Sequence, residues 1–234
     1  MTQRAAPAAQ LLLINPNTSE ATTALMAQLA RQRLPAQVEL LGATAQEGAP
    51  LITDEASLAI AVRQVVQMGE RFAQRRAAAG HRTPAVIVIG AFGNPGLAQL
   101  CARVSLPVLG LGAAAMRAGA RGGRRFGIAT ITPGLEASIA QSVAELGLSG
   151  QFSGTRIPPG VPQALAANPA LLRERLALAV EQCIALDGAE AVVIGGGPLA
   201  QAAQELAPLF AQPVISAVDA AVEEALELLG LQGE

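Results

Sequence analysis

The sequence predicts an α/β protein built from two similar three-layer α/β/α lobes, related by a pseudo-twofold axis, with mainly parallel sheets and an active-site cleft between them. Three observations support this fold class. Short apolar runs alternate with helical stretches along the chain, a pattern typical of parallel sheets covered by helices on both faces. Two long segments repeat the same order of elements. Polar or glycine-rich turns follow several of the apolar runs, where open parallel sheets bind their ligands.

The strands are predicted from apolar runs rich in β-branched residues, each of them too short to span a membrane. They lie at residues 11–14, 37–41, 85–89, 107–111, 126–131, 191–195 and 213–218. Because most of these runs are almost continuously apolar, both faces of each sheet are expected to be buried.

Three of the predicted helices have recognisable ends. Asn17, with Glu20 three positions later, forms a capping pair that begins a helix over residues 18–33. A long helix is expected over residues 54–79, because a glycine follows it. A third helix is expected over residues 133–146, since it begins at a proline and ends before a glycine.

The internal repeat defines the predicted lobes. Residues 85–115 and 191–221 both read as a strand, a turn with glycine and proline, a helix and a second strand introduced by Pro-Val. The strand and turn of residues 12–19 likewise match those of residues 126–134. The alternative is a chance similarity between alanine-rich segments. The predicted lobes are residues 1–115 with 215–234, and residues 116–214.

Composition limits the partners and the compartment. A net charge of −2 argues against nucleic acid, which requires a basic surface. The first ten residues contain no long apolar segment, so no signal peptide is expected, and no membrane association is indicated. Cys101 and Cys183 each lie inside an apolar helical pattern. These features favour a cytoplasmic protein without disulfides.

The absence of lysine and tyrosine and the presence of a single histidine restrict the chemistry further. The chain contains no lysine, which excludes Schiff-base chemistry and a P-loop lysine. His81 is the single histidine, so a histidine-rich metal site is excluded and no metal is expected. The absence of tyrosine removes a phenol as acid or base. As a general base, His81 is disfavoured because it precedes the strand at 85–89, at the end opposite the expected cleft.

Four turns are predicted to form the binding site, at residues 15–19, 91–96, 130–134 and 195–199. Each leads into a helix, and the free N–H groups of helix N-termini favour a small anion such as a carboxylate. The turns lack the G-x-G-x-x-G pattern of dinucleotide sites. The predicted binding residues are Asn15, Asn17, Thr18, Ser19, Phe92, Gly93, Asn94, Thr130, Thr132, Gly196, Gly197 and Pro198. The alternative for Asn17 alone is simple helix capping.

The segments INPNTS (14–19), EGAPLITDEASLAIA (47–61), AFGNPGL (91–97) and IGGGPLA (194–200) resemble motifs of the aspartate/glutamate racemase superfamily, in particular its hydantoin racemase branch. The resemblance extends from about residue 11 to residue 225. It implies a two-lobed enzyme without a cofactor that acts on a small carboxylate or cyclic amide derivative of an amino acid. We also expect a homo-oligomer.

The resemblance implies that two cysteines would flank the substrate's Cα, one as base and one as acid. Ala91 and Gly196 stand at these two positions, and neither side chain carries a proton. Cys101 lies ten residues beyond the first position, and Cys183 precedes the strand at 191–195. Proton transfer is therefore expected not to use a thiol.

Three carboxylates are candidates to replace the thiols: Asp54, Glu55 and Asp219. A carboxylate base requires burial or a like-charged neighbour that raises its pKa. The alternative for Asp54 and Glu55 is stabilisation of a first helical turn. Four functions stay open at this point: a divergent racemase, a lyase or hydrolase on a related acid, an inactive small-acid binding protein, or a structural subunit of an active relative.

Overall fold

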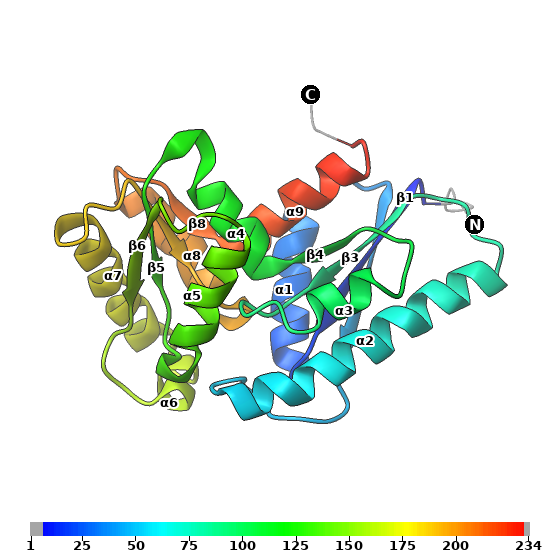
Figure 1. The fold of residues 1–234 in the computed structure, drawn as a ribbon, viewed down its shortest axis with the longest axis horizontal. Helices are drawn as coiled ribbons and strands as arrows, with labels where there is room; N and C mark the ends of the chain where they lie inside the picture. Colours follow the sequence, from blue (N-terminus) through cyan, green and yellow to red (C-terminus); the bar gives the residue numbers. More distant parts are fainter. Residues whose placement is uncertain (1–6, 232–234) are drawn as a thin grey trace.

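The apolar runs form two separate four-stranded sheets, and every strand pair in them is parallel (Figure 1). The computed structural model describes residues 7–231. The first sheet has the strand order β2-β1-β3-β4 and the second has the order β6-β5-β7-β8. Because the two orders are equivalent, the predicted two-lobed α/β fold is confirmed.

The strand bounds follow the apolar runs closely, with one exception. The strands are β1 Ala9–Asn15, β2 Val38–Thr44, β3 Ala85–Ile89, β4 Val108–Gly110, β5 Phe126–Ala129, β6 Phe152–Arg156, β7 Ala191–Ile194 and β8 Val214–Ser216. Strand β6 was not predicted. It lies at the edge of its sheet, is half-buried along its length, and its sequence FSGTR therefore lacks the apolar run that identifies the other strands.

Helices connect the strands and cover both faces of each sheet. They are α1 Glu20–Arg33, α2 Glu55–Ala78, α3 Leu97–Cys101, α4 Leu111–Gly119, α5 Glu136–Glu145, α6 Pro162–Ala166, α7 Pro169–Ala185, α8 Ala200–Leu206 and α9 Ala217–Leu228. Short 3-10 turns lie at η1 Arg121–Gly123, η2 Pro133–Leu135, η3 Gly197–Leu199 and η4 Ala207–Leu209. Within the described residues, no helix is both long enough and apolar enough to cross a membrane.

One predicted helix start was wrong. The residue that caps α1 is Ser19, whose hydroxyl accepts a hydrogen bond from the Thr22 N–H at 3.2 Å, and not Asn17. Asn17 instead accepts the Ser19 N–H through its side-chain oxygen. The long helix over 54–79 was correct to within one residue at each end, because Asp54 and Ser57 form a capping box.

Each lobe contributes one helix that packs on the other lobe. Helix α4 follows β4 of the first sheet, but it packs on α9 and against β5, β7 and β8 of the second sheet. Helix α9 follows β8 of the second sheet and packs on α1 and β3 of the first sheet. One apolar core therefore runs through both lobes, from Leu11 and Met26 to Phe126 and Ile128. The predicted division of the chain at residues 115/116 and 214/215 stays a prediction, and its ends, 1–6 and 232–234, lie outside the described residues.

Small residues allow helix α4 to approach the backbone of the first lobe. A Cβ atom added at Gly112 would overlap the carbonyl oxygen of Phe92. This glycine therefore brings the N-terminal turn of α4 directly against the turn that follows β3.

We expect Gly112→Ala to destabilise the protein by about 1–3 kcal/mol, because the added methyl forces the Phe92 backbone to move. In an unobstructed helix the same exchange stabilises by up to about 1 kcal/mol. Urea unfolding followed by circular dichroism measures the difference. Gly150→Ala is the control, since a Cβ there has no neighbour within 4 Å. A Gly112→Ala protein as stable as the natural one would contradict the packing described.

Candidate functional site

One cavity lies between the lobes, at the carboxyl ends of β1, β3, β5 and β7. It contains about 520 Å³ of empty space, part of it open to solvent. The wall consists of Asn17, Leu51, Ile52, Leu58, Gly90, Ala91, Phe92, Gly93, Thr130, Ile131, Thr132, Leu135, Gly195, Gly196, Gly197, Pro198 and Leu199. All four predicted turns contribute, so the structure brings the predicted segments together across the two lobes.

Eight of the predicted binding residues line this cavity: Asn17, Phe92, Gly93, Thr130, Thr132, Gly196, Gly197 and Pro198. Asn15, Thr18, Ser19 and Asn94 do not. Asn15, Ser19 and Asn94 use their side chains in hydrogen bonds within the turns around the cavity, and Thr18 uses its N–H to bond the Ala49 carbonyl. Their role as ligand contacts stays a prediction.

The polar residues after β1 are hydrogen-bonded to one another. Asn15 is fully buried, and its amide donates to Asn17 Oδ1 at 2.9 Å and to Thr23 Oγ1 at 3.0 Å. Ser19 N–H also donates to Asn17 Oδ1 at 2.9 Å. Among the described residues, no acceptor receives a hydrogen bond from Asn17 Nδ2, although only 4% of this residue is exposed. The Asn17 amide is thus fixed at its oxygen, and its nitrogen is without an acceptor in a residue that lines the cavity.

The turn after β3 is fixed by Asn94 against helix α4. Asn94 adopts a left-handed backbone conformation with φ +48°, which an asparagine tolerates better than most residues. Its side-chain oxygen accepts the Ala113 N–H at 3.1 Å. This contact holds the neighbouring Phe92 and Gly93 at the cavity wall.

In the second lobe, two threonines connect the remaining turns. Thr130 Oγ1 donates to the Gly195 carbonyl oxygen at 2.9 Å and lies 3.3 Å from Thr132 Oγ1. Both side chains are buried. Because the Thr130 proton is used by Gly195, Thr132 is the donor of the 3.3 Å contact, and this long hydrogen bond is the one that a ligand oxygen can replace.

Each of the three consecutive glycines at 195–197 meets a separate requirement. A Cβ at Gly195 would lie 2.8 Å from the Phe92 ring, and a Cβ at Gly197 would overlap Met26 Sδ. Gly196 has φ +140°, a conformation that is strained for residues with a side chain. A cysteine at position 196 would be strained in the same way, so this turn is shaped for glycine.

Within the part of the chain that the structure describes, no ionisable side chain lines the cavity, and the three predicted carboxylates lie outside it. Asp54 caps helix α2, and hydrogen bonds from the backbone and side chain of Ser57 lower its pKa, which is the wrong direction for a base near neutral pH. Glu55 is exposed in the first turn of the same helix. Within residues 7–231, no three side chains of His, Cys, Asp or Glu gather as metal ligands do.

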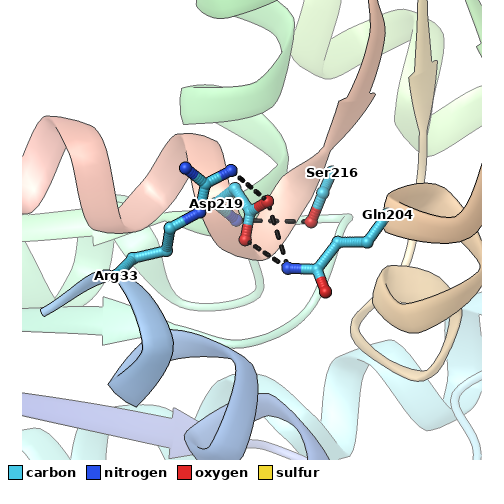
Figure 2. Close-up of polar contacts among 4 residues, drawn as sticks. All are labelled: Arg33, Gln204, Ser216 and Asp219. Atoms are coloured by element: carbon cyan, nitrogen blue, oxygen red, sulfur yellow. Dashed lines mark hydrogen bonds and ion pairs between the residues drawn. The ribbon is translucent and has the colours of Figure 1, made fainter. Parts of the chain in front are cut away.

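Asp219 does not line the cavity, and its carboxylate contacts side chains from both lobes (Figure 2). Its carboxylate accepts from Arg33 Nη2, at the C-terminal end of α1, at 3.0 Å and from Gln204 Nε2, on α8, at 2.9 Å. The Asp219 backbone N–H donates a hydrogen bond to Ser216 Oγ at 3.4 Å. We call Arg33, Gln204 and Asp219 the lobe clasp. Helix α1 starts next to the cavity and spans 14 residues, which puts Arg33 about 20 Å from that end.

The two cysteines differ in exposure. Cys101 is exposed and Cys183 is buried, and neither lines the cavity. Burial, with a smaller contribution from the charge of Asp187, raises the pKa of the Cys183 thiol to about 12. Cys183 packs against Gly127 of β5 and is therefore a core residue.

Sequence reasoning missed the apolar half of the cavity wall. Leu51, Ile52 and Leu58 come from the segment before α2 and its first turn, and Leu135 comes from η2 on the opposite lobe. In the sequence these apolar side chains look like ordinary core residues. The available signal was the position of Leu51, Ile52 and Leu58 in the segment 47–61, which resembles a family motif.

The fold and the cavity define a class of two-lobed α/β proteins that hold a small ligand between equivalent turns. The model of the Asp/Glu/hydantoin racemase family matches residues 11–225, and the chain belongs to this family. It is 28% identical over 225 residues to the hydantoin racemase of Paenarthrobacter aurescens, which covers 95% of this chain and 93% of that one.

Solved structures agree with this assignment. The allantoin racemase from Klebsiella pneumoniae superposes with a TM-score of 0.84 at 28% identity, covering 97% of this chain and 90% of the other. The allantoin racemase from Pseudomonas fluorescens has a TM-score of 0.81 at 23% identity, covering 96% and 93%. The similarity to the Pseudomonas fluorescens protein concerns the fold alone.

Alkylation is expected to distinguish the two thiols by their reactivity. Because the pKa of Cys183 is raised to about 12, roughly one molecule in ten thousand carries a Cys183 thiolate at about pH 8. Native protein treated with iodoacetamide should therefore gain one label, at Cys101, and denatured protein two. Mass spectrometry of the intact chain and its peptides reads this directly. Rapid labelling of Cys183 in the native state would show that it is accessible after all.

Removing the lobe clasp is expected to cost stability. Asp219→Ala leaves Arg33 and Gln204 without their shared acceptor, and we expect the free energy of unfolding to fall by about 1–3 kcal/mol. The matched control is Glu223→Ala on the same helix, whose side chain is exposed and whose loss should change stability by less than about 0.5 kcal/mol. Equal effects of the two substitutions in a urea titration would argue against the clasp.

Proposed function

We propose that the chain is a cofactor-independent racemase for a hydantoin or related cyclic amide that carries an apolar substituent at its stereocentre. The observation that carries this proposal is the cavity shared by both lobes, with apolar walls and a few hydrogen-bond donors, in a member of this family. The similarity to a hydantoin racemase and an allantoin racemase supports the substrate class.

The cavity wall favours a neutral ring over a free dicarboxylate. Among residues 7–231, no arginine or histidine lines it, and the chain has no lysine. A carboxylate would therefore be desolvated there without a paired cation from these residues. A cyclic amide can instead bond to Asn17, Thr132 and the N–H groups of the turns. Leu51, Leu58 and Leu135 then offer apolar surface to its substituent.

The proposed reaction exchanges one proton. The C–H bond at the ring carbon next to the carbonyl breaks, its electron pair moves onto the carbonyl oxygen as an enolate, and hydroxide or water takes the proton. A water molecule on the opposite face returns a proton to the same carbon. Hydrogen bonds to the developing oxyanion stabilise the enolate, the same effect that oxyanion holes exert in acyl transfer. In this scheme the residues at positions 91 and 196, an alanine and a glycine, carry no proton.

Turnover in deuterated water tests the proposal. Enantiopure 5-benzylhydantoin should gain deuterium at its stereocentre and lose optical rotation faster with the protein than in buffer or with heat-denatured protein. Thr132→Val, which removes the hydroxyl and preserves the shape, should lower the rate by about 10–100-fold. Glu223→Gln, exposed and distant on α9, is the control that should leave the rate unchanged.

The same assay tests the three predicted carboxylates. Because none lines the cavity, we expect Asp54→Asn, Glu55→Gln and Asp219→Asn each to retain most of the rate. Loss of deuterium exchange in one of them, with the fold intact, would identify that group as the proton carrier in place of water.

A second candidate is a binding protein that retained the cavity without turnover. It is favoured by one observation: the described residues place no ionisable side chain in the wall. Calorimetric binding of 5-benzylhydantoin without any deuterium incorporation would select this candidate over the racemase.

We further propose that the protein acts in the cytoplasm as a homo-oligomer on a small substrate. Two cysteines that are free and unpaired in the described part of the chain support a reducing compartment. Light scattering of the purified protein measures the assembly.

A further inference from the structure

Met26 lies behind the cavity, at a place where the two lobes meet. It comes from the middle of helix α1 in the first lobe, and α1 also packs on η3, the turn of the second lobe that follows β7. Met26 is completely buried and is not itself part of the cavity wall. It can therefore affect a ligand only through the turns that it contacts.

The Met26 side chain contacts one turn from each lobe. A Cβ atom added at Gly90, which follows β3 in the first lobe, would lie 2.9 Å from Met26 Cε. A Cβ added at Gly197, in the second lobe, would overlap Met26 Sδ and would lie 3.1 Å from the Gly90 carbonyl oxygen. Both glycines line the cavity. One thioether thus fills the space between two turns that belong to different lobes.

These two turns carry wall residues of opposite lobes. Ala91 follows Gly90, Gly196 precedes Gly197, and both line the cavity. In the proposed reaction a proton leaves one face of the ring carbon and another proton reaches the opposite face. The separation of the two turns therefore sets the space for the ring and for the water on either side of it. A misplacement of about 1 Å can lower a rate about 100-fold.

Methionine suits this place better than other apolar residues do. Its unbranched, flexible chain fits the narrow space between two backbone turns. Leucine has a similar volume, and a core usually tolerates this exchange. However, leucine branches at Cγ and lacks the fourth side-chain atom, so it cannot contact both turns in the same way.

We infer that Met26 is a spacer that sets the distance between the turns after β3 and β7, which makes it a positioning residue for the reaction. The inference rests on the proposed function only where turnover is concerned. The contact of Met26 with Gly90 and Gly197 belongs to the fold and is measurable without a substrate.

Turnover of 5-benzylhydantoin tests the positioning role. In the deuterium exchange assay, well below the thermal midpoint of the variant, Met26→Leu should lower kcat at least about tenfold and change KM less than about threefold. The control is Met116→Leu on α4, which is also completely buried but is not among the atoms nearest to any glycine of the cavity wall. It should keep kcat within about twofold of the natural protein. Equal kcat values for the two variants would overturn the inference.

A pair of substitutions tests the contact itself. Gly197→Ala places its methyl on Met26 Sδ and should lower the urea midpoint of unfolding. Met26→Ala removes the sulfur, so the double variant should unfold at a higher urea concentration than the sum of the two single shifts allows. Additive shifts would show that Met26 does not support the second turn and would overturn the inference. If Gly197→Ala does not fold, the same cycle with Gly90→Ala decides.

The two assays separate this inference from the proposed function. If the natural protein does not turn over 5-benzylhydantoin, the proposed function fails, and the urea midpoints alone decide whether Met26 spaces the turns. If the natural protein is active and the urea shifts are coupled, but Met26→Leu keeps its full kcat, Met26 supports the fold without positioning the reaction, and the inference is overturned.

Discussion

Close contact between the turns of the two lobes is the constraint on which the rest of the site depends. The Phe92 ring lies on Gly195, Met26 lies under Gly197, and the Thr53 carbonyl lies on Gly134. Protein interiors are packed so densely that one methyl group at such a contact forces a neighbour to move. The glycines therefore set both the distance between the lobes and the width of the cavity.

The same contacts explain the chemistry that the cavity wall offers. Within residues 7–231, the cavity wall contains no side chain that ionises near neutral pH, and its donors are backbone N–H groups, Asn17 and Thr132. Such a wall stabilises developing charge on a ligand oxygen by fixed dipoles. The family's architecture is thus combined with a wall in which the described side chains offer no general base.

Much of the fold could be predicted because burial leaves a strong pattern. The strands β1, β3 and β7 are buried along their length and read as continuous apolar runs. The edge strand β6 could not be recognised, since a half-buried strand needs no such run. At the site, the turns after β1, β3, β5 and β7 were identified by their glycines and polar residues. The leucines opposite them were not, because an apolar residue in a cavity wall looks like one in a core.

The roles of individual polar residues were harder to predict for a related reason. Ser19, Asn15 and Asn94 are short polar side chains beside a cavity, and the sequence alone does not distinguish one that bonds a ligand from one that bonds its own backbone. Asp219 was expected near a substrate because it follows β8 closely. Its carboxylate instead faces Arg33 and Gln204, partners 186 and 15 positions away, which no local pattern indicates.

The exchange of helices α4 and α9 has a consequence for how the molecule can be divided. Each half ends in a helix whose apolar side is matched to the other half's sheet. A chain that ended after α4 would expose the apolar side of that helix, and its sheet would lack one of its covering helices. Two copies of such a fragment could cover these surfaces by exchanging their last helices. The architecture therefore suggests an ancestor that was a symmetric dimer of half-length chains.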